Sequence, residues 1–230
     1  MKQPINKVTQ TAKKRPLLVT ALIFVAYLLP LLLFIGLADE VRDGEVLFFD
    51  KPFMLYVHSL SSAGLTQFFE AVTQLGGVVF VPILTAVLAA ILWWRTRRKK
   101  PVLFLLSAVG GAAILNVIFK TMFQRTRPDF WEHLVQEHSY SFPSGHAMAS
   151  SALALALIIL CWRTRWRWLA LIGGAIYMII IGLSRIYLGV HYPSDILAGW
   201  CVSLVWVLLL AGLVYEYMVR YSYKRKKEKS

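Results

Sequence analysis

Apolar residues fill six long stretches of the chain, and polar residues are concentrated in the connections between them. The stretches cover residues 17–37, 71–94, 102–119, 147–162, 169–183 and 196–219. A helix needs about 20 mainly apolar residues to cross the hydrocarbon layer of a bilayer, so the fourth and fifth stretches must extend into their flanking residues. The pattern predicts an all-α, polytopic membrane protein with six transmembrane helices.

The composition of the chain excludes an ordinary soluble domain. Hydrophobic residues make up 58% of the 230 residues, and the mean hydropathy is +0.60. In soluble domains the apolar share is about half, even with glycine included. No internal repeat or low-complexity linker divides the chain. We therefore expect a single membrane domain over residues 1–230, with basic tails at 1–16 and 220–230.

Basic residues lie mostly on one side of this predicted bundle. Nineteen of the 25 lysines and arginines belong to the two tails or to the connections at 95–100 and 163–167. These regions share one side because successive spans alternate in direction, and loops rich in Lys and Arg remain in the cytoplasm. Both termini are therefore predicted to be cytoplasmic. The compact loops favour a bacterial cytoplasmic (inner) membrane.

The formal net charge of +13 follows from this topology. A nucleic-acid-binding protein gathers its basic residues on one folded surface, whereas here they are divided among four loop ends and tails. Nucleic acid is therefore not an expected partner, and the anionic headgroups of the bilayer are. The sequence predicts no obligate protein partner.

The first external connection covers residues 38–70. Its second half, at 46–60, has apolar residues at roughly helical spacing with polar residues between them. This pattern is typical of a helix that lies in the membrane interface, so an interfacial helix on the outer leaflet is expected. His58 is a lone histidine beside aromatic residues there, and we expect it to be structural.

Three polar stretches face the external side of the predicted bundle. They are K-T-M-F-Q-R-T-R-P at 120–128, F-P-S-G-H at 142–146 and S-R-I-Y-L-G-V-H-Y-P-S-D at 184–195. Lys120, Arg127 and Arg185 are three of only six external basic residues. Ionisable groups beside the hydrocarbon are costly unless they are paired, and clustered cations repel one another unless an anion lies between them. A shared anion site is the simplest explanation.

Phosphate is the anion that these residue types suit best. Arginine offers forked donors to phosphate oxygens, and lysine adds a compact charge. Ser144 and Gly145 precede a helix, where a hydroxyl, close backbone approach and free N–H groups favour an anion. Other residues of the same connection are expected to form a solvated rim or to contact headgroups: Arg125, Asp129, Glu132, His133, Glu137 and His138.

Two histidines at helix starts indicate chemistry as well as binding. His191 precedes Asp195 by four residues. A neutral imidazole attacks phosphorus, and a carboxylate on its other ring nitrogen selects the tautomer and stabilises the positive charge that develops. His146 is then free to protonate the leaving oxygen as a general acid. We therefore expect His191 as nucleophile, Asp195 as its partner and His146 as the acid.

The motifs K-x6-R-P, P-S-G-H and S-R-x5-H-x3-D together resemble the type 2 phosphatidic acid phosphatase family, the membrane relatives of vanadium haloperoxidases. The resemblance covers residues 120–195, and no motif position departs from the family pattern. It implies a lipid phosphatase with no metal ion and no other cofactor. By this resemblance Lys120, Arg127, Ser144, Gly145 and Arg185 bind phosphate. The same resemblance makes His146 the acid, His191 the nucleophile and Asp195 its partner.

Alternatives remain open at this point. The three cations also suit contacts with headgroups, and the His191–Asp195 pair also suits a structural helix cap. A phosphotransferase that passes the phosphoryl group to an acceptor other than water would use the same residues. A non-catalytic binder or transporter of lipid phosphates is a third class. Undecaprenyl diphosphate, phosphatidylglycerophosphate and phosphatidate all fit an external site at headgroup depth.

Overall fold

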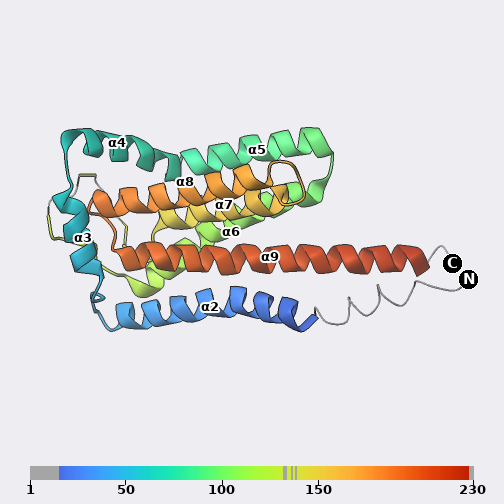
Figure 1. Ribbon diagram of the computed structural model, residues 1–230, viewed down its shortest axis with the longest axis horizontal. Helices are drawn as coiled ribbons and strands as arrows, with labels where there is room; N and C mark the ends of the chain where they lie inside the picture. The colour runs from blue at the N-terminus through green and yellow to red at the C-terminus, as the bar shows by residue number, and fades with distance from the viewer. Residues whose placement is uncertain (1–15, 132–133, 136, 138, 228–230) are drawn as a thin grey trace, which may run out of the picture.

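The protein is an elongated bundle of helices in the computed structural model (Figure 1). The structure describes the backbone of residues 16–131, 134–135, 137 and 139–227, and the side chains in these ranges except at 16–23 and 214–227. This part of the chain contains eight α-helices and one 3-10 turn and has no strand, so the predicted all-α class is confirmed. The elements are α2 (Pro16–Arg42), α3 (Asp50–Ser59), α4 (Ala63–Thr73), η1 (Gln74–Gly76), α5 (Phe80–Thr96), α6 (Lys99–Phe123), α7 (Gly145–Cys161), α8 (Arg167–Tyr187) and α9 (Pro193–Lys227).

Several helices have the length and composition of membrane spans. In the described residues, α2, α6, α8 and α9 each contain an apolar segment long enough to cross a bilayer. The bent pair formed by α4 and α5 is a fifth candidate, and α7 is a shorter apolar helix of 17 residues. The protein is therefore an integral membrane protein with several spans.

The second predicted span differs from a single helix over 71–94. Its helical path begins earlier, at Ala63, and α4 meets α5 at an angle of 49°. Gly77 has an extended backbone at the break. In an unbroken helix the ring of Pro82 would clash with the carbonyl four residues earlier. In the first turn of α5 the missing N–H of proline leaves no hydrogen bond unmade. A hydropathy pattern records the apolar run but not this interruption.

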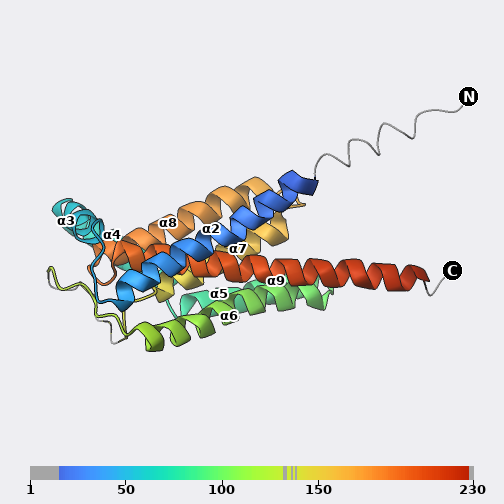
Figure 2. The ribbon, with the colours of Figure 1, turned by 90° about the horizontal axis from the view of Figure 1, so that it is seen from below.

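Helix α7 lies at the centre of the bundle and packs against α6, α8 and α9 (Figure 2). Its inward face consists of small residues, and Ala147, Ala152 and Ala156 are fully buried. Small side chains let neighbouring helices approach closely in a membrane protein. The polar N-terminal end of α7 is thereby surrounded by the ends of its neighbours.

One end of the bundle gathers the elements that carry the sequence motifs. The last turns of α6 and α8 and the first turns of α7 and α9 meet there, and α3 stands across this end (Figure 1). α3 confirms that the first connection contains a helix. Met54 and Asp50 are its buried residues.

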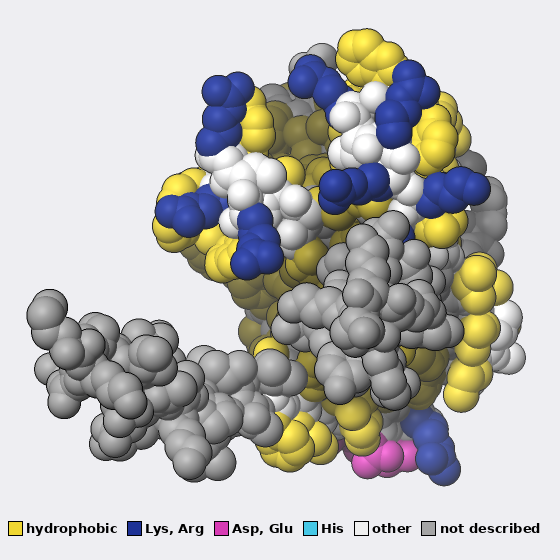
Figure 3. Space-filling view, turned by 90° about the vertical axis from the view of Figure 1, so that its right-hand side faces the viewer, with side chains coloured by type: hydrophobic (Ala, Val, Ile, Leu, Met, Phe, Trp, Pro, Cys, Tyr) yellow, Lys and Arg dark blue, Asp and Glu magenta, His cyan; other side chains and the backbone are white. Residues whose placement is uncertain are grey.

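The opposite end is basic, as Figure 3 shows. The α5–α6 and α7–α8 connections place their lysines and arginines there with exposed side chains: Arg95, Arg97, Arg98, Lys99, Lys100, Arg163, Arg165 and Arg167. The basic connections and the motif-bearing elements therefore lie at opposite ends of the molecule.

Candidate active site

The turn between α8 and α9 holds the His191–Asp195 pair. Gly189 allows the chain to reverse with a φ of +79°, and Pro193 begins α9 two residues after His191. The Nδ1 atom of His191 lies 3.2 Å from Oδ2 of Asp195, and both side chains are buried. An ionised carboxylate only accepts hydrogen bonds, so Nδ1 carries the proton and Nε2 keeps its lone pair. The predicted pair is therefore formed, and Nε2 of His191 is unprotonated.

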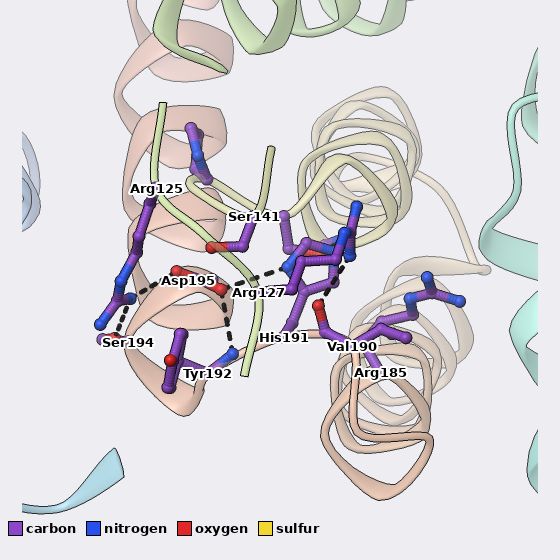
Figure 4. A network of polar contacts seen from close by, with 12 residues as sticks. Arg125, Arg127, Ser141, Arg185, Val190, His191, Tyr192, Ser194 and Asp195 are labelled. Atoms are coloured by element: carbon purple, nitrogen blue, oxygen red, sulfur yellow. Dashed lines mark hydrogen bonds and ion pairs between the residues drawn. The ribbon is translucent and has the colours of Figure 1, made fainter. Parts of the chain in front are cut away.

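Arg127 lies beside the unprotonated Nε2 of His191. Its Nη1 donates to the carbonyl of Val190 at 2.6 Å and lies 3.3 Å from Nε2 of His191 (Figure 4). The guanidinium is therefore anchored beside the unprotonated nitrogen of the imidazole.

The surroundings keep His191 neutral. Burial lowers the pKa of His191 well below its ordinary value, and the charges of Arg127, Arg185 and Lys120 lower it further. A neutral imidazole is the form required of a nucleophile.

Two further cations lie close to His146 and His191, near enough for their charges to interact with both imidazoles. Lys120, at the end of α6, donates to Oγ of Ser139 at 2.8 Å. Arg185, in the last turn of α8, is 2% exposed and donates to Oγ1 of Thr73 at 2.9 Å. The structure thus brings the three predicted phosphate-binding cations together.

Glu137 bridges two of these cations. Its carboxylate accepts a short hydrogen bond from Arg185 and lies 3.5 Å from Nη2 of Arg127. The expectation that Glu137 belongs to a solvated rim was wrong, because its carboxylate pairs with the cations of the site. Oxygen atoms of a carboxylate resemble those of a phosphate in charge and in their preference for guanidinium groups.

The P-S-G-H turn begins α7. Ser144 is fully buried, and its Oγ caps the helix by accepting from the N–H of Ala147 at 3.4 Å. Its own N–H donates to the main-chain carbonyl of Asp195 at 3.1 Å, which joins the starts of α7 and α9. The N–H groups of Gly145 and His146 follow in the first turn, where no preceding helical turn supplies a carbonyl. These two groups are the donors that this turn offers to an anion.

Asn116 of α6 supports the same turn. It donates to the carbonyl of Pro143 at 2.9 Å, and a Cβ on Gly145 would lie 3.0 Å from its Oδ1. Any larger residue at position 145 would therefore press on the Asn116 amide.

His146 borders a cavity of about 480 Å³ at the break between α4 and α5. Its polar lining includes Thr73, Glu137 and Arg185, and the apolar lining comes from α5 and the residues before it. Val78 and Val79, on that apolar side, are largely exposed on the surface of the bundle. The cavity thus extends from the polar side chains at His146 to the apolar outer surface of the bundle.

Arg125 is buried beside the His191–Asp195 pair, contrary to expectation. It was expected in the solvated rim, but its side chain is 7% exposed and its Nη1 lies 2.6 Å from Oδ1 of Asp195. Its Nη2 lies 3.1 Å from Oδ2 of Asp50, which is fully buried at the start of α3. No local signal in the sequence marks this role, because Asp50 and Asp195 are 75 and 70 residues away from Arg125 along the chain.

The other rim residues have different outcomes. Asp129 is exposed, as expected. Glu132, His133 and His138 lie outside the described residues. His58 stacks on the ring of Trp131 with centroids 4.2 Å apart, in agreement with a structural role. Within the described part of the chain, no three or more His, Cys, Asp or Glu side chains are grouped as metal ligands.

Comparison with known proteins places this geometry in a family. Residues 101–218 match the PAP2 superfamily. Phosphatidylglycerophosphatase B of Bacillus subtilis is 28% identical over 186 residues, which cover 79% of this chain and 91% of that protein. An undecaprenyl-diphosphatase of Sulfolobus acidocaldarius is 31% identical over 138 residues, or 58% of this chain and 62% of that protein.

Solved structures agree with this assignment. The crystal structure of the PAP2-type phosphatidylglycerolphosphate phosphatase of Bacillus subtilis superposes with a TM-score of 0.76 at 26% identity, over 84% of this chain and 97% of that one. The Aquifex aeolicus LpxE structure shares the fold, with a TM-score of 0.61 at 23% identity over 73% of this chain and 98% of that chain. Since the family match includes all three motifs and half of the chain, the protein belongs to the PAP2 superfamily of membrane lipid phosphatases, enzymes that work without a metal ion.

Proposed function

We propose that the protein hydrolyses a phosphate ester or diphosphate on a membrane lipid through a phosphohistidine intermediate at His191. The observation that carries this proposal is the neutral imidazole of His191, whose Nδ1 faces Asp195 while Nε2 lies beside Arg127. Phosphatidylglycerophosphate and undecaprenyl diphosphate are the substrate candidates that the relatives' names favour. Phosphatidate fits the same geometry.

The proposed reaction has two steps. Nε2 of His191 attacks phosphorus, and the bond from phosphorus to the leaving oxygen breaks. His146 gives that oxygen a proton, which it carries in the substrate complex, where the negative phosphate offsets the charges of the three cations. His146 then accepts a proton from water, and the resulting hydroxide attacks the phosphohistidine, which releases inorganic phosphate and restores the imidazole. Asp195 stabilises the positive charge on His191 in both steps.

The phosphate oxygens have a defined set of proposed partners. Lys120, Arg127 and Arg185 supply charge, and Ser144 and Gly145 belong to the turn whose N–H groups face the anion. Preorganised donors of this kind stabilise charge that develops in the transition state. The substrate must first displace the carboxylate of Glu137 from the two arginines.

We also propose six spans: α2, the α4–α5 pair, α6, α7, α8 and α9. The basic end then faces the cytoplasm together with both termini, as the distribution of positive charge favours (Figure 3). The site would face the periplasm or exterior of a bacterial inner membrane, and α3 would lie at the outer interface. Residues 1–230 would form a single domain.

Phosphate release from a panel of lipids tests the proposed reaction. Purified protein is incubated with phosphatidylglycerophosphate, undecaprenyl diphosphate or phosphatidate in the presence of a chelator. We expect release with at least one lipid, its loss in His191→Ala, and full activity in the control His58→Ala. Alkaline quenching with labelled lipid should trap a phosphohistidine in the wild type.

Other outcomes would identify the alternative functions. Label that appears in an added alcohol instead of inorganic phosphate would indicate a phosphotransferase. Binding of lipid phosphates without turnover would indicate a binder or transporter. Undiminished phosphate release by His191→Ala would refute the nucleophile assignment.

A further inference from the structure

A buried cluster of charges lies behind the His191–Asp195 pair, on the side away from Arg127 and Arg185 (Figure 4). Arg125 donates from Nη1 to Oδ1 of Asp195 at 2.6 Å and to Oγ of Ser194 at 2.8 Å. From Nη2 it donates to Oδ2 of Asp50 at 3.1 Å. Its guanidinium also lies 4.0 Å from the centre of the Tyr192 ring. Nothing in the proposed phosphate chemistry uses Arg125 or Asp50 directly.

The two oxygens of Asp195 have separate tasks. Oδ1 faces Arg125, while Oδ2 accepts from the N–H of Tyr192 at 2.9 Å and faces Nδ1 of His191 at 3.2 Å. A rotation of the carboxylate would break its contacts on both sides. Arg125 on Oδ1 and the N–H of Tyr192 on Oδ2 thereby hold the carboxylate with Oδ2 toward His191.

Arg125 also keeps the carboxylate charged. Asp195 and Asp50 are both fully buried, and a buried carboxylate without a cation tends to take up a proton. A protonated Asp195 would stabilise a positive imidazole poorly. Arg125 is the guanidinium that contacts both acids.

Asp50 holds this guanidinium from the other side. Its Oδ1 accepts from the N–H of Ser194 at 2.9 Å, and its Oδ2 accepts from the Ser194 hydroxyl at 2.6 Å. Asp50 begins α3 and Ser194 lies in the first turn of α9. The helix in the first connection is therefore joined directly to the element that carries Asp195.

We propose that Arg125, held in place by Asp50 of α3, is a positioning residue that orients and charges Asp195 for catalysis by His191. This inference rests on the proposed function, because it assumes that His191 is the nucleophile. Neither Arg125 nor Asp50 touches the substrate. Their effect on the rate passes through Asp195.

Kinetics of Arg125→Gln provide the first test. Partners that orient a reactive group from behind typically contribute about 10–100-fold to activity. We expect kcat to fall by about this factor, with KM and the inhibition constant of vanadate changed by less than about threefold, since the phosphate-binding cations remain. Arg125→Lys, which keeps the charge without the fork, should recover part of the loss.

A double-mutant cycle separates positioning from a general structural effect. If Arg125 acts through Asp195, then Arg125→Gln should cause little further loss in an Asp195→Asn background. Multiplicative losses would overturn the proposal, as would an unchanged kcat in Arg125→Gln.

Asp50→Asn keeps the size of the side chain and tests the role of α3. We expect a smaller fall in kcat than for Arg125→Gln, and none for the neighbouring control Lys51→Gln. If Arg125→Gln does not fold, the same double-mutant cycle is measured by combining Arg125→Lys or Asp50→Asn with Asp195→Asn. Two results separate this inference from the proposed function. An active His191→Ala variant refutes the proposed function. Multiplicative losses in the cycle, together with an inactive His191→Ala variant, refute only the positioning role of Arg125.

Discussion

The protonation state of His191 follows from its neighbours. Burial and three nearby cations lower its pKa below the ordinary value of 6.5, so the folded protein holds this imidazole neutral. In the unfolded chain His191 takes up a proton as the pH falls through about 6.5. The unfolded state then binds more protons than the folded state, and acidification through this range must destabilise the protein.

Replacement of His191 should remove this contribution to the pH dependence of stability. We expect the wild type to lose stability relative to His191→Gln as the pH falls from about 7.5 to about 5.5, because glutamine takes up no proton. Thermal unfolding of both proteins in detergent across this range measures the difference. Parallel curves for the two proteins would show that His191 is not held neutral by the fold.

Glu137 pairs with Arg127 and Arg185, so we expect its carboxylate to compete with the substrate for these two cations. Partly exposed ion pairs contribute about 0.2–1 kcal/mol each, so the loss of both pairs in Glu137→Gln should lower KM by about two- to thirtyfold. The value of kcat should not fall, since Glu137 takes no part in the proposed proton transfers. Steady-state kinetics and inhibition by inorganic phosphate provide the measurement.

Asp129→Asn is the matched control for this experiment, because Asp129 is an exposed acid of the same connection. It should leave KM unchanged. A higher KM in Glu137→Gln would mean that the carboxylate organises Arg185 for binding instead of competing with the substrate.

The residues predictable from sequence are those whose chemistry is visible within a motif. His191 and Asp195 are four residues apart, and their pairing follows from local spacing. Arg125 is separated from Asp50 and Asp195 by 75 and 70 residues, respectively. Glu137 and Arg185 are 48 residues apart. In the sequence Arg125 and Glu137 resemble ordinary solvated charges, because only the packing of α3, α8 and α9 determines which loop charges are enclosed.

At the scale of single elements, the break between α4 and α5 places a backbone turn against His146. A Cβ added to Gly76 would lie 2.5 Å from Cγ2 of Ile181 and 3.4 Å from Cδ2 of His146. The helix α8 therefore approaches the break so closely that only glycine fits. The hydropathy of 71–94 predicted a span in this region, but this contact depends on tertiary packing and leaves no periodic signal.

Substitution of Gly76 should therefore destabilise the bundle and disturb His146, the proposed general acid. We expect Gly76→Ala to reduce the free energy of unfolding by about 1–3 kcal/mol, the usual effect of overpacking a buried position. The wild type and variant can be compared by thermal unfolding. Activity should fall as well, because His146 lies at the same contact.

Gly110→Ala is the control for this substitution, since no atom lies within 4 Å of its added Cβ in α6. Alanine favours a helix interior over glycine by about 0.5–1 kcal/mol, so stability should be equal or higher. In an Ile181→Ala background, which removes the methyl group in the way, Gly76→Ala should cost less stability than it does in the wild type. Equal stability of Gly76→Ala and the wild type would show that the break moves to accept the methyl group.

At the scale of the whole molecule, the alternation of spans brings distant motifs together. The ends of α6 and α8 and the starts of α7 and α9 must share one side whenever consecutive helices run in opposite directions. This is why three short motifs separated by loops and whole helices were predicted to converge from the sequence alone. The orientation of the bundle in the membrane rests on a different property, namely the basic residues at the far end (Figure 3).

This orientation is testable with single cysteines at the two ends. Ser61 is exposed next to α3 at the site end, and Arg98 is exposed in the α5–α6 connection at the basic end. In a background without Cys161 and Cys201, a membrane-impermeant maleimide should label Ser61→Cys in intact spheroplasts. Arg98→Cys should react only after permeabilisation, because loops rich in positive charge are retained in the cytoplasm. The reverse pattern would place the site in the cytoplasm, where a lipid phosphate of the inner leaflet would have to be its substrate.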